Sequence, residues 1–350
     1  MILLLATLAQ AATFAEPVPL DGTRVVEGVV VESQVHWAPE GLVTAHQVLV
    51  GHDIVEVLTP GGTKDGLTMR RTDAAVLVRG STYRLQLIPR DGAWAVLDGA
   101  LGAEPLHGAP PPWAHNGNSW AFQDEPVEQP FYVALSTFPV AWDLDALDER
   151  VAESVRTWNV EGQVPLRLWT DGEPPTATVY AADGEDAITW EDRSLTSTSV
   201  LGVATMWSDG ADFTDCDVTI YGANLSGSIC WSLDAAGAPE GCYDLRHTLT
   251  HELGHCLGLG HSDLSQAIMT GYAPIASGDE HRHLHADDIA GLQALYGASE
   301  VELALTGAAV EPASGTAVVE GTGFRVVATL EGLGGSHAWE VGITAEADRP

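Results

Sequence analysis

The spacing of hydrophobic residues changes once along the chain. Residues 16–108 carry short apolar runs, such as Val25–Val31, Tyr83–Ile88 and Trp94–Leu97, separated by turn residues. Such runs are typical of β-strands. Further strands are expected at His46–Val50, Ile54–Leu58 and Ala75–Val78. We therefore predict an all-β barrel or sandwich for residues 16–108.

Helical periodicity enters the pattern after about residue 113. Asp143 can cap a helix at this point. The apolar side chains of this helix recur at helical spacing and are Leu144, Leu147, Val151, Val155 and Trp158. Strands are expected at Phe131–Leu135, Pro165–Thr170, Ala187–Trp190, Leu201–Trp207 and Asp217–Tyr221. Further helices are expected at about Tyr243–Leu257 and at Ala286–Tyr296, so the pattern predicts an α+β domain over residues 115–298.

The segments outside these two domains are short. Met1–Ala11 is apolar and ends in small residues, which indicates a secretory signal peptide, assigned to residues 1–15. Residues 109–114 contain three consecutive prolines, which favour a stiff, extended linker. Residues 299–350 return to β character and are expected to form a small β module or tail. The strands expected in it are Ala317–Val319 and Phe324–Leu330.

The charge of the chain limits its partners. It has 49 acidic and 15 basic residues, a formal net charge of −34. This charge argues against nucleic acid or an anionic membrane as a partner. The apolar run at the N-terminus is also too short to span a bilayer. We therefore expect a soluble, secreted, extracellular monomer.

Candidate metal ligands and a candidate general base are concentrated in eleven consecutive residues that begin at His251. His251 and His255 are four residues apart, so a helix would place both imidazoles on one face, where they can share a zinc ion. Glu252 can hold a water at that zinc as general base. Gly258 allows the helix to stop and the chain to turn back, which would bring His261 to the metal as third ligand. Three ligands with an open fourth position indicate a catalytic zinc.

This spacing, H-E-x-x-H-x-x-G-x-x-H, resembles the extended zinc-binding pattern of the metzincins. A methionine follows His261 at Met269, as in the methionine turn of that group. The run Asp287–Gly297 and the residue after the last histidine, Ser262, resemble the matrixin branch, the family of the matrix metalloproteinases. The lean architecture is similar to that of bacterial secreted members. The resemblance covers roughly residues 115–298.

The resemblance implies a zinc metalloendopeptidase with a twisted, mostly parallel sheet and three helices. Peptide bonds would be hydrolysed by a zinc-activated water with Glu252 as general base. Met269 would lie beneath the zinc, Asp287 would brace the methionine turn, and Tyr272 would lie near the wall of the specificity pocket. The substrate would pair with an edge strand at Leu201–Trp207. Its substrate-binding residues would be Leu201, Gly202, Val203 and Ala204.

Four aspartates precede the zinc motif closely enough to suggest a second metal. By their density of oxygen ligands they resemble a calcium loop, and they are Asp209, Asp212, Asp215 and Asp217. The alternative is an ordinary solvated acidic surface.

All four cysteines of the chain fall inside the α+β domain, and an even number permits two bridges. Cys230–Cys242 would close a short loop. Cys216 lies on one strand face and Cys256 on the apolar face of the zinc helix, so they can pair if the helix packs on the sheet. The alternative is two buried free thiols.

Two features of the vertebrate matrix metalloproteinases are absent from the sequence. No histidine lies between Asn116 and Arg246, so a second, structural zinc is not expected. No cysteine lies in residues 1–215, so an inhibitory cysteine ahead of the catalytic domain is not expected either.

The leading hypothesis is a secreted zinc endopeptidase with a protein or peptide substrate. One alternative is a secreted binding or surface protein with a vestigial zinc site. Another is a processing enzyme that acts on a single partner, which sequence alone does not distinguish from a broad protease.

Overall fold

The computed structural model describes residues 13–14, 22–90, 92–107, 119–120, 127–162, 164, 166–171, 181–210, 212–262, 264–275, 277–278, 281–297, 305–311 and 325–330. The chain divides into two compact units, residues 1–299 and residues 300–350. The first unit holds both the β-rich region and the zinc motif. The predicted linker at 109–114 lies outside the described residues, as does most of the predicted signal peptide.

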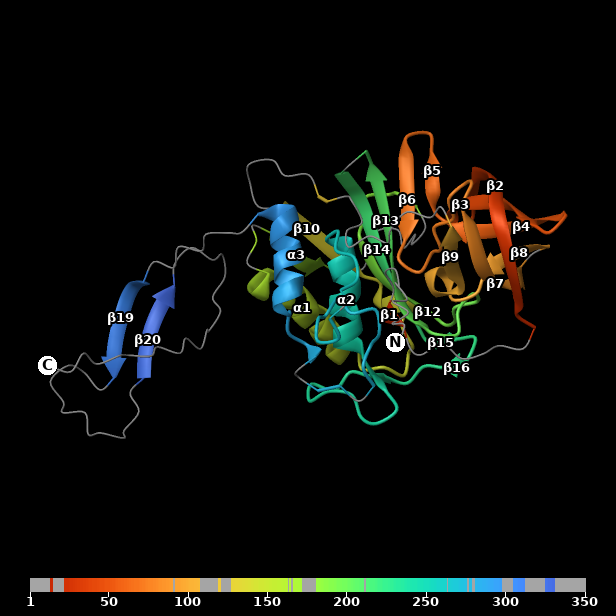
Figure 1. The fold of residues 1–350 in the computed structure, drawn as a ribbon. Helices are drawn as coiled ribbons and strands as arrows, with labels where there is room; N and C mark the ends of the chain where they lie inside the picture. The colour runs from red at the N-terminus through yellow and green to blue at the C-terminus, as the bar shows by residue number, and fades with distance from the viewer. Residues whose placement is uncertain are drawn as a thin grey trace, which may run out of the picture. The chain divides into compact units, whose positions relative to one another are not determined.

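Strands of the first hundred residues form a six-stranded sheet in the order β2-β3-β4-β8-β7-β9. Its strands are β2 (Arg24–Ala38), β3 (Gly41–Val50), β4 (Asp53–Pro60), β7 (Thr82–Arg90), β8 (Ala93–Val96) and β9 (Ala103–His107). β2 also pairs with β7, which closes β2, β3, β4, β8 and β7 into a ring (Figure 1). The interior is filled by Val30, Val48, Val57, Leu85 and Leu87, all buried. We call residues 22–107 the β domain.

One strand expected in the β domain does not form. Residues 75–78 make no ladder, and the Tyr83 hydroxyl holds this segment instead. It accepts from the backbone N–H of Val78 at 3.0 Å and donates to the carbonyl of Val76 at 3.2 Å. The side chain therefore supplies the hydrogen bonds that a neighbouring strand would have made.

The zinc motif begins on a helix that packs against a second, larger sheet, in the order β11-β10-β12-β14-β13-β6-β5, with β1 also paired to β13. Its strands are β1 (Thr13–Phe14), β5 (Gly62–Lys64), β6 (Leu67–Arg71), β10 (Val127–Val133), β11 (Leu166–Asp171), β12 (Ala187–Glu191), β13 (Val200–Asp209) and β14 (Asp212–Tyr221). β11, β10, β12 and β14 are parallel, whereas β13 is antiparallel to β14. β5 and β6 come from the β domain, so both parts of the first unit share this sheet.

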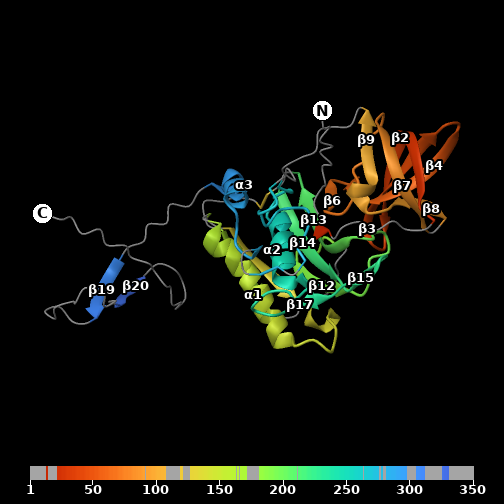
Figure 2. The ribbon, with the colours of Figure 1, turned by 60° about the horizontal axis from the view of Figure 1, so that its bottom comes forward.

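Three helices of the described chain accompany this sheet (Figures 1 and 2). They are α1 (Leu144–Glu161), α2 (Leu245–Cys256) and α3 (Ala286–Tyr296). Asp143 caps α1 as expected, because its side chain accepts from the backbone N–H groups of Asp145 and Ala146. α1 and α2 lie side by side, and Trp158 Nε1 donates to the carbonyl of Thr250 at 2.8 Å. The first unit is therefore an α+β assembly around one main core.

Shorter elements connect these parts. They are the 3₁₀ turns η1 (Gly99–Gly102) and η2 (Leu135–Thr137) and the strands β15 (Ala223–Asn224), β16 (Gly227–Ser228), β17 (Trp231–Ser232) and β18 (Tyr243–Asp244). Both expected disulfides are present, Cys216–Cys256 and Cys230–Cys242. In the second unit, β19 (Leu305–Glu311) and β20 (Arg325–Leu330) form an antiparallel hairpin, and residues 317–319 lie outside the described chain. Among the described residues, no helix is long and apolar enough to cross a membrane.

Candidate metal centre

The helix that carries the zinc motif is anchored at its first turn by a buried carboxylate. Asp244 caps α2, since its Oδ1 accepts from the backbone N–H of Arg246 at 3.0 Å. The other oxygen of Asp244 accepts from Arg282 Nε at 2.6 Å, and both side chains are about 1% exposed. A buried ion pair of this kind fixes position, because loss of either partner leaves an uncompensated charge. The sequence analysis identified neither residue.

The other end of α2 turns where glycine was expected. α2 ends at Cys256, and Gly258 has φ +95°, a left-handed conformation that glycine adopts at no steric cost. The backbone N–H of Leu259 then bonds to the carbonyl of Gly254 at 3.0 Å. This turn sends the chain back towards α2 and places His261 beside the two helical histidines.

The three histidines meet at their Nε2 atoms. His251 Nε2 lies 2.9 Å from His255 Nε2 and 3.2 Å from His261 Nε2, and one ligand atom of each residue lies within 4.8 Å of the others. Among the described residues, these histidines are the group of three or more His, Cys, Asp or Glu side chains whose ligand atoms lie within 4.8 Å of one another.

Backbone carbonyls decide which ring nitrogens face the centre. Nδ1 of His251 donates to Ile268 O at 2.7 Å, and Nδ1 of His255 donates to Leu259 O at 2.8 Å. Because a carbonyl only accepts, each Nδ1 carries the proton and each Nε2 presents a lone pair. Burial, and then the neighbouring imidazoles, lower the pKa of His255 to about 3 and that of His251 well below its usual value. Neutral lone pairs at this distance repel unless a cation lies between them, so the donor set fits zinc.

Glu252 is fully buried between α2 and β13. Its nearest backbone neighbour on β13 is Gly202: a β-carbon at Gly202 would lie 3.1 Å from Glu252 Cγ and 3.2 Å from Oε1. The strand that was expected to pair with substrate therefore lies directly against this carboxylate.

Met269 packs against the zinc helix from below. A β-carbon at Gly254 would collide with Met269 Sδ and lie 2.6 Å from Trp158 Cζ2, so glycine is what lets the methionine approach. The carboxylate that holds this turn belongs to Asp288. It accepts from the backbone N–H groups of Ile268 at 2.9 Å and Met269 at 3.0 Å.

The expectation that Asp287 braces the methionine turn therefore needs correction. Asp287 is exposed and accepts from Ser262 Oγ at 2.6 Å. Asp288 is one residue farther along α3, which turns its side chain inward, where burial raises its pKa. Both residues start the same helix, and sequence offered no signal to choose between them.

Two of the five expected substrate-binding residues, Leu201 and Tyr272, line one groove. Leu201, Gly202, Val203 and Ala204 are all buried in β13. Tyr272 is 43% exposed and lines a groove of about 1130 Å³ together with Leu201 and Thr270. Leu201 and Tyr272 therefore line the same groove. β13 is not the free edge strand that was expected, because β6 pairs with it from Thr205 to Asp209.

The four candidate calcium residues separate into two pairs. Asp209 and Asp212 face each other at the exposed end of the β13–β14 hairpin. Asp215 and Asp217 are buried near Asp186, a residue that the sequence analysis did not single out. One oxygen of each of these three buried carboxylates, namely Asp186 Oδ2, Asp215 Oδ1 and Asp217 Oδ2, has no hydrogen-bond partner among the described residues.

The pKa values of these three buried carboxyl groups are raised, as expected for carboxylates that lack full hydrogen bonding. Burial raises the pKa of Asp215 to about 7, and that of Asp186 and Asp217 well above the usual value. The oxygens are not arranged as a ready metal site, because the described acidic side chains contain no group of three with ligand atoms within 4.8 Å.

Comparison with known proteins places the region around the metal centre in a family. The family model described as Matrixin matches residues 155–297. Human matrix metalloproteinase-19 is 55% identical over 62 residues, which are 17% of this chain and 12% of that protein. Mouse interstitial collagenase B is 27% identical over 169 residues, 48% of this chain and 34% of that protein. Metalloendoproteinase 5-MMP of Arabidopsis thaliana is 50% identical over 54 residues, 15% of this chain and 14% of that protein.

These matches cover about a third or less of each relative, so they concern one region and not the whole protein. Among solved structures, metalloproteinase-II from Bacteroides fragilis aligns with 73% of this chain and 88% of its own, at 13% identity and a TM-score of 0.28. At that score the alignment carries no argument about the fold.

Proposed function

Residues 155–297 belong to the matrixin family of metzincins, and from this premise we propose that the protein is a zinc-dependent endopeptidase. The observation that carries the proposal is the convergence of three histidine Nε2 atoms beside a buried glutamate. A structural zinc would need a fourth protein ligand, whereas three ligands leave room for water.

His251, His255 and His261 would hold the zinc. Bound there, the ion would lower the pKa of a water and polarise a peptide carbonyl. The bonds from Nδ1 of His251 and His255 to backbone carbonyls hold both rings in the orientation that ligation needs. Met269 supplies an apolar floor and not a ligand, since its sulfur packs on Gly254.

Glu252 would act as general base and then as general acid. It would take a proton from the attacking water and pass it to the leaving nitrogen. A β-carbon at position 202 would lie 3.2 Å from Glu252 Oε1, so glycine there leaves space for the carboxylate. The substrate backbone would pair with β13 near Leu201–Ala204, and Tyr272 would border the pocket for the side chain after the scissile bond.

The wider setting in this proposal is a secreted, monomeric enzyme. Residues 1–15 would be the signal peptide, 16–108 an N-terminal all-β region, 109–114 a linker, 115–298 the catalytic region and 299–350 an added β segment. Two disulfides support export, because such bonds persist in oxidising compartments.

A calcium ion at Asp186, Asp215 and Asp217 is a smaller part of the proposal. Their buried, unpartnered oxygens support it, since buried carboxylates are expensive unless paired or bound to a metal. The three side chains would have to draw together on binding. Stabilisation by calcium that disappears in Asp217→Asn but persists in Asp212→Asn would support this site, whereas equal stabilisation of all three proteins would rule it out.

The main proposal is tested by cleavage of casein with the purified protein, Glu252→Gln, and the matched surface control Glu240→Gln. We expect the wild type and Glu240→Gln to cleave, and Glu252→Gln to lose roughly 10²–10⁴-fold in rate while still binding one zinc. Zinc binding without cleavage by any of the three would favour the vestigial or single-partner alternatives. Cleavage by Glu252→Gln at the wild-type rate would show that another group is the base.

A further inference from the structure

The outer edge of the catalytic strand β13 is largely occupied by the β domain. β6 pairs with β13 in antiparallel register from Thr205↔Arg71 to Asp209↔Leu67. One residue beyond this ladder, the backbone N–H of Thr72 donates to Ala204 O at 3.1 Å. Thr72 Oγ1 accepts from the backbone N–H of Ala204 at 2.9 Å. Every outward backbone group from Ala204 onwards therefore faces the β domain.

Only a short stretch of the same edge remains for another strand. Successive residues of a strand direct their backbone groups to opposite edges, so Gly202 and Val200 face outward like Ala204. In the structure these two residues pair with β1, antiparallel, as Thr13↔Gly202 and Phe14↔Val200. An extended segment therefore fits here, immediately beside Glu252.

The direction of pairing decides which half of a substrate is affected. Both strands on this edge, β1 and β6, run antiparallel to β13. A substrate in the place of β1 has its scissile bond near Gly202, because Glu252 lies there. Its residues before that bond then run towards Ala204 and meet Thr72, whereas its residues after the bond run past Val200 towards the open groove.

The β domain is built into the catalytic part by burial as well as by strand pairing. Trp207 of β13 is fully buried in a cluster with Leu42 and Met69, and Trp37 stacks on it at 6.0 Å between ring centroids. Removal of the β domain would expose this tryptophan to water, which is unfavourable in proportion to the apolar area.

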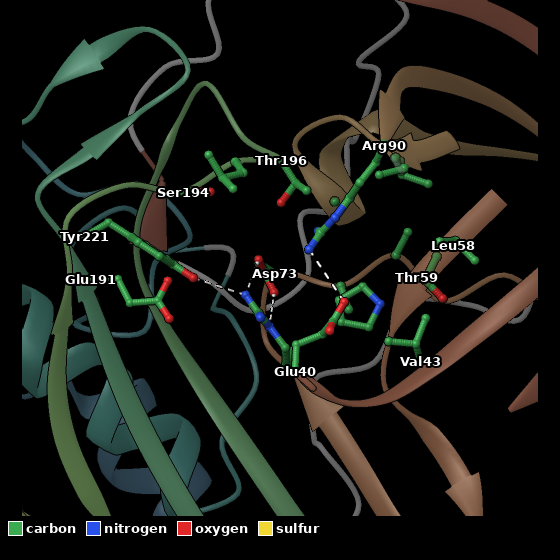
Figure 3. Close-up of a pocket in the computed structure, with 18 of the residues that line it drawn as sticks. Glu40, Val43, Leu58, Thr59, Asp73, Arg90, Glu191, Ser194, Thr196 and Tyr221 are labelled. Atoms are coloured by element: carbon green, nitrogen blue, oxygen red, sulfur yellow. Dashed lines mark hydrogen bonds and ion pairs between the residues drawn. The ribbon is translucent and has the colours of Figure 1, made fainter. Parts of the chain in front are cut away.

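Polar contacts join the two parts on the other side of β6. A cavity of about 140 Å³ lies between them. Figure 3 shows Tyr221 of β14 directed towards the acidic and basic side chains of the β domain. Arg71 Nη2 donates to the Tyr221 hydroxyl at 3.2 Å and to Asp73 Oδ2 at 2.9 Å. Within the β domain, Arg90 and Glu40 form an ion pair at 3.6 Å that lines the same cavity.

A third link is the carboxylate of Asp98, in the β domain. Its Oδ1 accepts from Ser197 Oγ and from the backbone N–H of Thr198, both at 2.6 Å, and from Ser199 Oγ at 3.1 Å. These three residues lead directly into β13, so Asp98 fixes the start of the substrate edge.

We propose that the β domain is a permanent wall of the substrate cleft and determines specificity, by closing the amino-terminal half of the cleft at Thr72 and β6. The inference rests on the proposed peptidase activity. Substrate is then recognised chiefly by the residues after the scissile bond, and only about two residues before it can pair with β13. Removal of residues 1–15, the predicted signal peptide, would take β1 away and open Val200 and Gly202, whereas β6 would stay.

The first test uses peptides built around the strongest cleavage site found in casein. The carboxyl side is kept constant and the amino side is lengthened one residue at a time. We expect kcat/KM to stop rising after about two amino-side residues, while lengthening the carboxyl side continues to raise it. A steady rise of kcat/KM along a longer amino side would overturn the proposal.

The second test locks the wall in place with a disulfide between Thr68→Cys and Ser208→Cys. These residues face each other in the ladder, and such pairs lie about 4.5–5.5 Å apart, within the span of a disulfide. The single variants are the controls, and none of these side chains belongs to the proposed catalytic machinery. We expect the locked enzyme to keep kcat/KM within about twofold of the single variants. A tenfold or larger loss, restored by mild reduction, would show instead that β6 must leave before substrate binds.

Hydrogen exchange can test whether β6 stays paired with β13, and this measurement does not require catalytic activity. In Glu252→Gln, the amides of Met206 and Ser208 should exchange slowly with or without a casein peptide. In the protein without residues 1–15, and therefore without β1, the amide of Gly202 should become protected only when the peptide binds. Fast exchange at the amides of Met206 and Ser208 would contradict the proposed role of the β domain, even if the enzyme is active. Failure of the wild type to cleave, with those amides protected, would count against the peptidase alone.

Discussion

Gly202 of β13 leaves space for the side chain of Glu252, because a β-carbon added at Gly202 would lie only 3.1 Å from Glu252 Cγ. That distance is shorter than ordinary van der Waals contact between carbons. Position 202 therefore controls where the carboxylate can stand, although it has no side chain of its own.

Gly202→Ala should impair catalysis more than folding. The new methyl would displace Glu252, and we expect kcat to fall about tenfold or more, since small misplacements of catalytic groups are costly. Zinc content and melting temperature should stay near those of the wild type. The measurement is casein cleavage beside zinc analysis, and unchanged kcat would mean that Glu252 tolerates the shift or is not the base.

Asp288 and Asp287 form a matched pair of variants. Asp288→Ala leaves two buried backbone N–H groups, those of Ile268 and Met269, without their acceptor. We expect it to cost about 2–4 kcal/mol in unfolding free energy and to weaken zinc binding. Asp287→Ala removes an exposed contact and should cost less than about 1 kcal/mol. Denaturant titration of both variants decides between them, and a larger loss for Asp287→Ala would contradict the assignment.

Removal of zinc should destabilise the protein. His251 and His255 place Nε2 lone pairs 2.9 Å apart, and the metal offsets their repulsion. At free zinc one hundred times the dissociation constant, binding contributes about 2.7 kcal/mol, or roughly 5–10 °C in melting temperature. Thermal melts before and after dialysis against a chelator measure this shift. His261→Ala should lose most of it, and an equal shift in that variant would place the metal elsewhere.

Asp98→Ala should lower the stability of the β domain and of the catalytic part together. Four donors of Ser197, Thr198 and Ser199 lose their acceptor, for which we expect about 3 kcal/mol. Asp53→Ala, at an exposed position of the same domain, is the control. Calorimetry should show one transition that moves to lower temperature. Two separated transitions in the wild type would mean that the β domain and the catalytic part unfold independently.

His46 should make stability depend on pH. Burial lowers its pKa to about 4 from the ordinary 6.5, and its ring contacts Ser33 Oγ and Thr59 Oγ1 at 2.8 and 2.9 Å. As pH falls below 6.5 the unfolded chain takes up the proton first, so stability present above pH 6.5 is lost towards pH 4. The loss amounts to at most about 3 kcal/mol. The difference in unfolding free energy between wild type and His46→Gln should shrink over this range, and a constant difference would contradict the shift.

The metal centre was predictable because its information is local. His251, His255 and His261 lie within eleven residues, and helix geometry with one glycine turn brings them together. The Cys216–Cys256 bridge spans 40 residues, yet it followed from the faces of one strand and one helix. For the histidines, local secondary structure indicated which side chains meet, whereas the bridge also required the helix to pack on the sheet.

The contacts that shape the cleft were not predictable in this way. Thr72 meets Ala204 across 132 positions, and Asp98 meets Thr198 across 100. Neither residue stands in a periodic pattern, and β6 ends in Arg70 and Arg71, so it offers no apolar run that would indicate a strand. Residues 75–78 were wrongly expected as a strand for the opposite reason, since a tyrosine hydroxyl replaced the ladder. Such features depend on tertiary packing, which the spacing of hydrophobic residues along the chain does not predict.

The β domain supplies β6 to the sheet that supports the zinc helix. The part of the protein that must be transferred together is therefore larger than residues 155–297, which match the family model. A gene fusion that carried only residues 115–298 would present the bare edge of β13 as a template for foreign strands. We expect such a fragment to aggregate. Chimaeras that keep residues 22–297 together retain β5 and β6 beside β13, so recombination would have to move both parts at once.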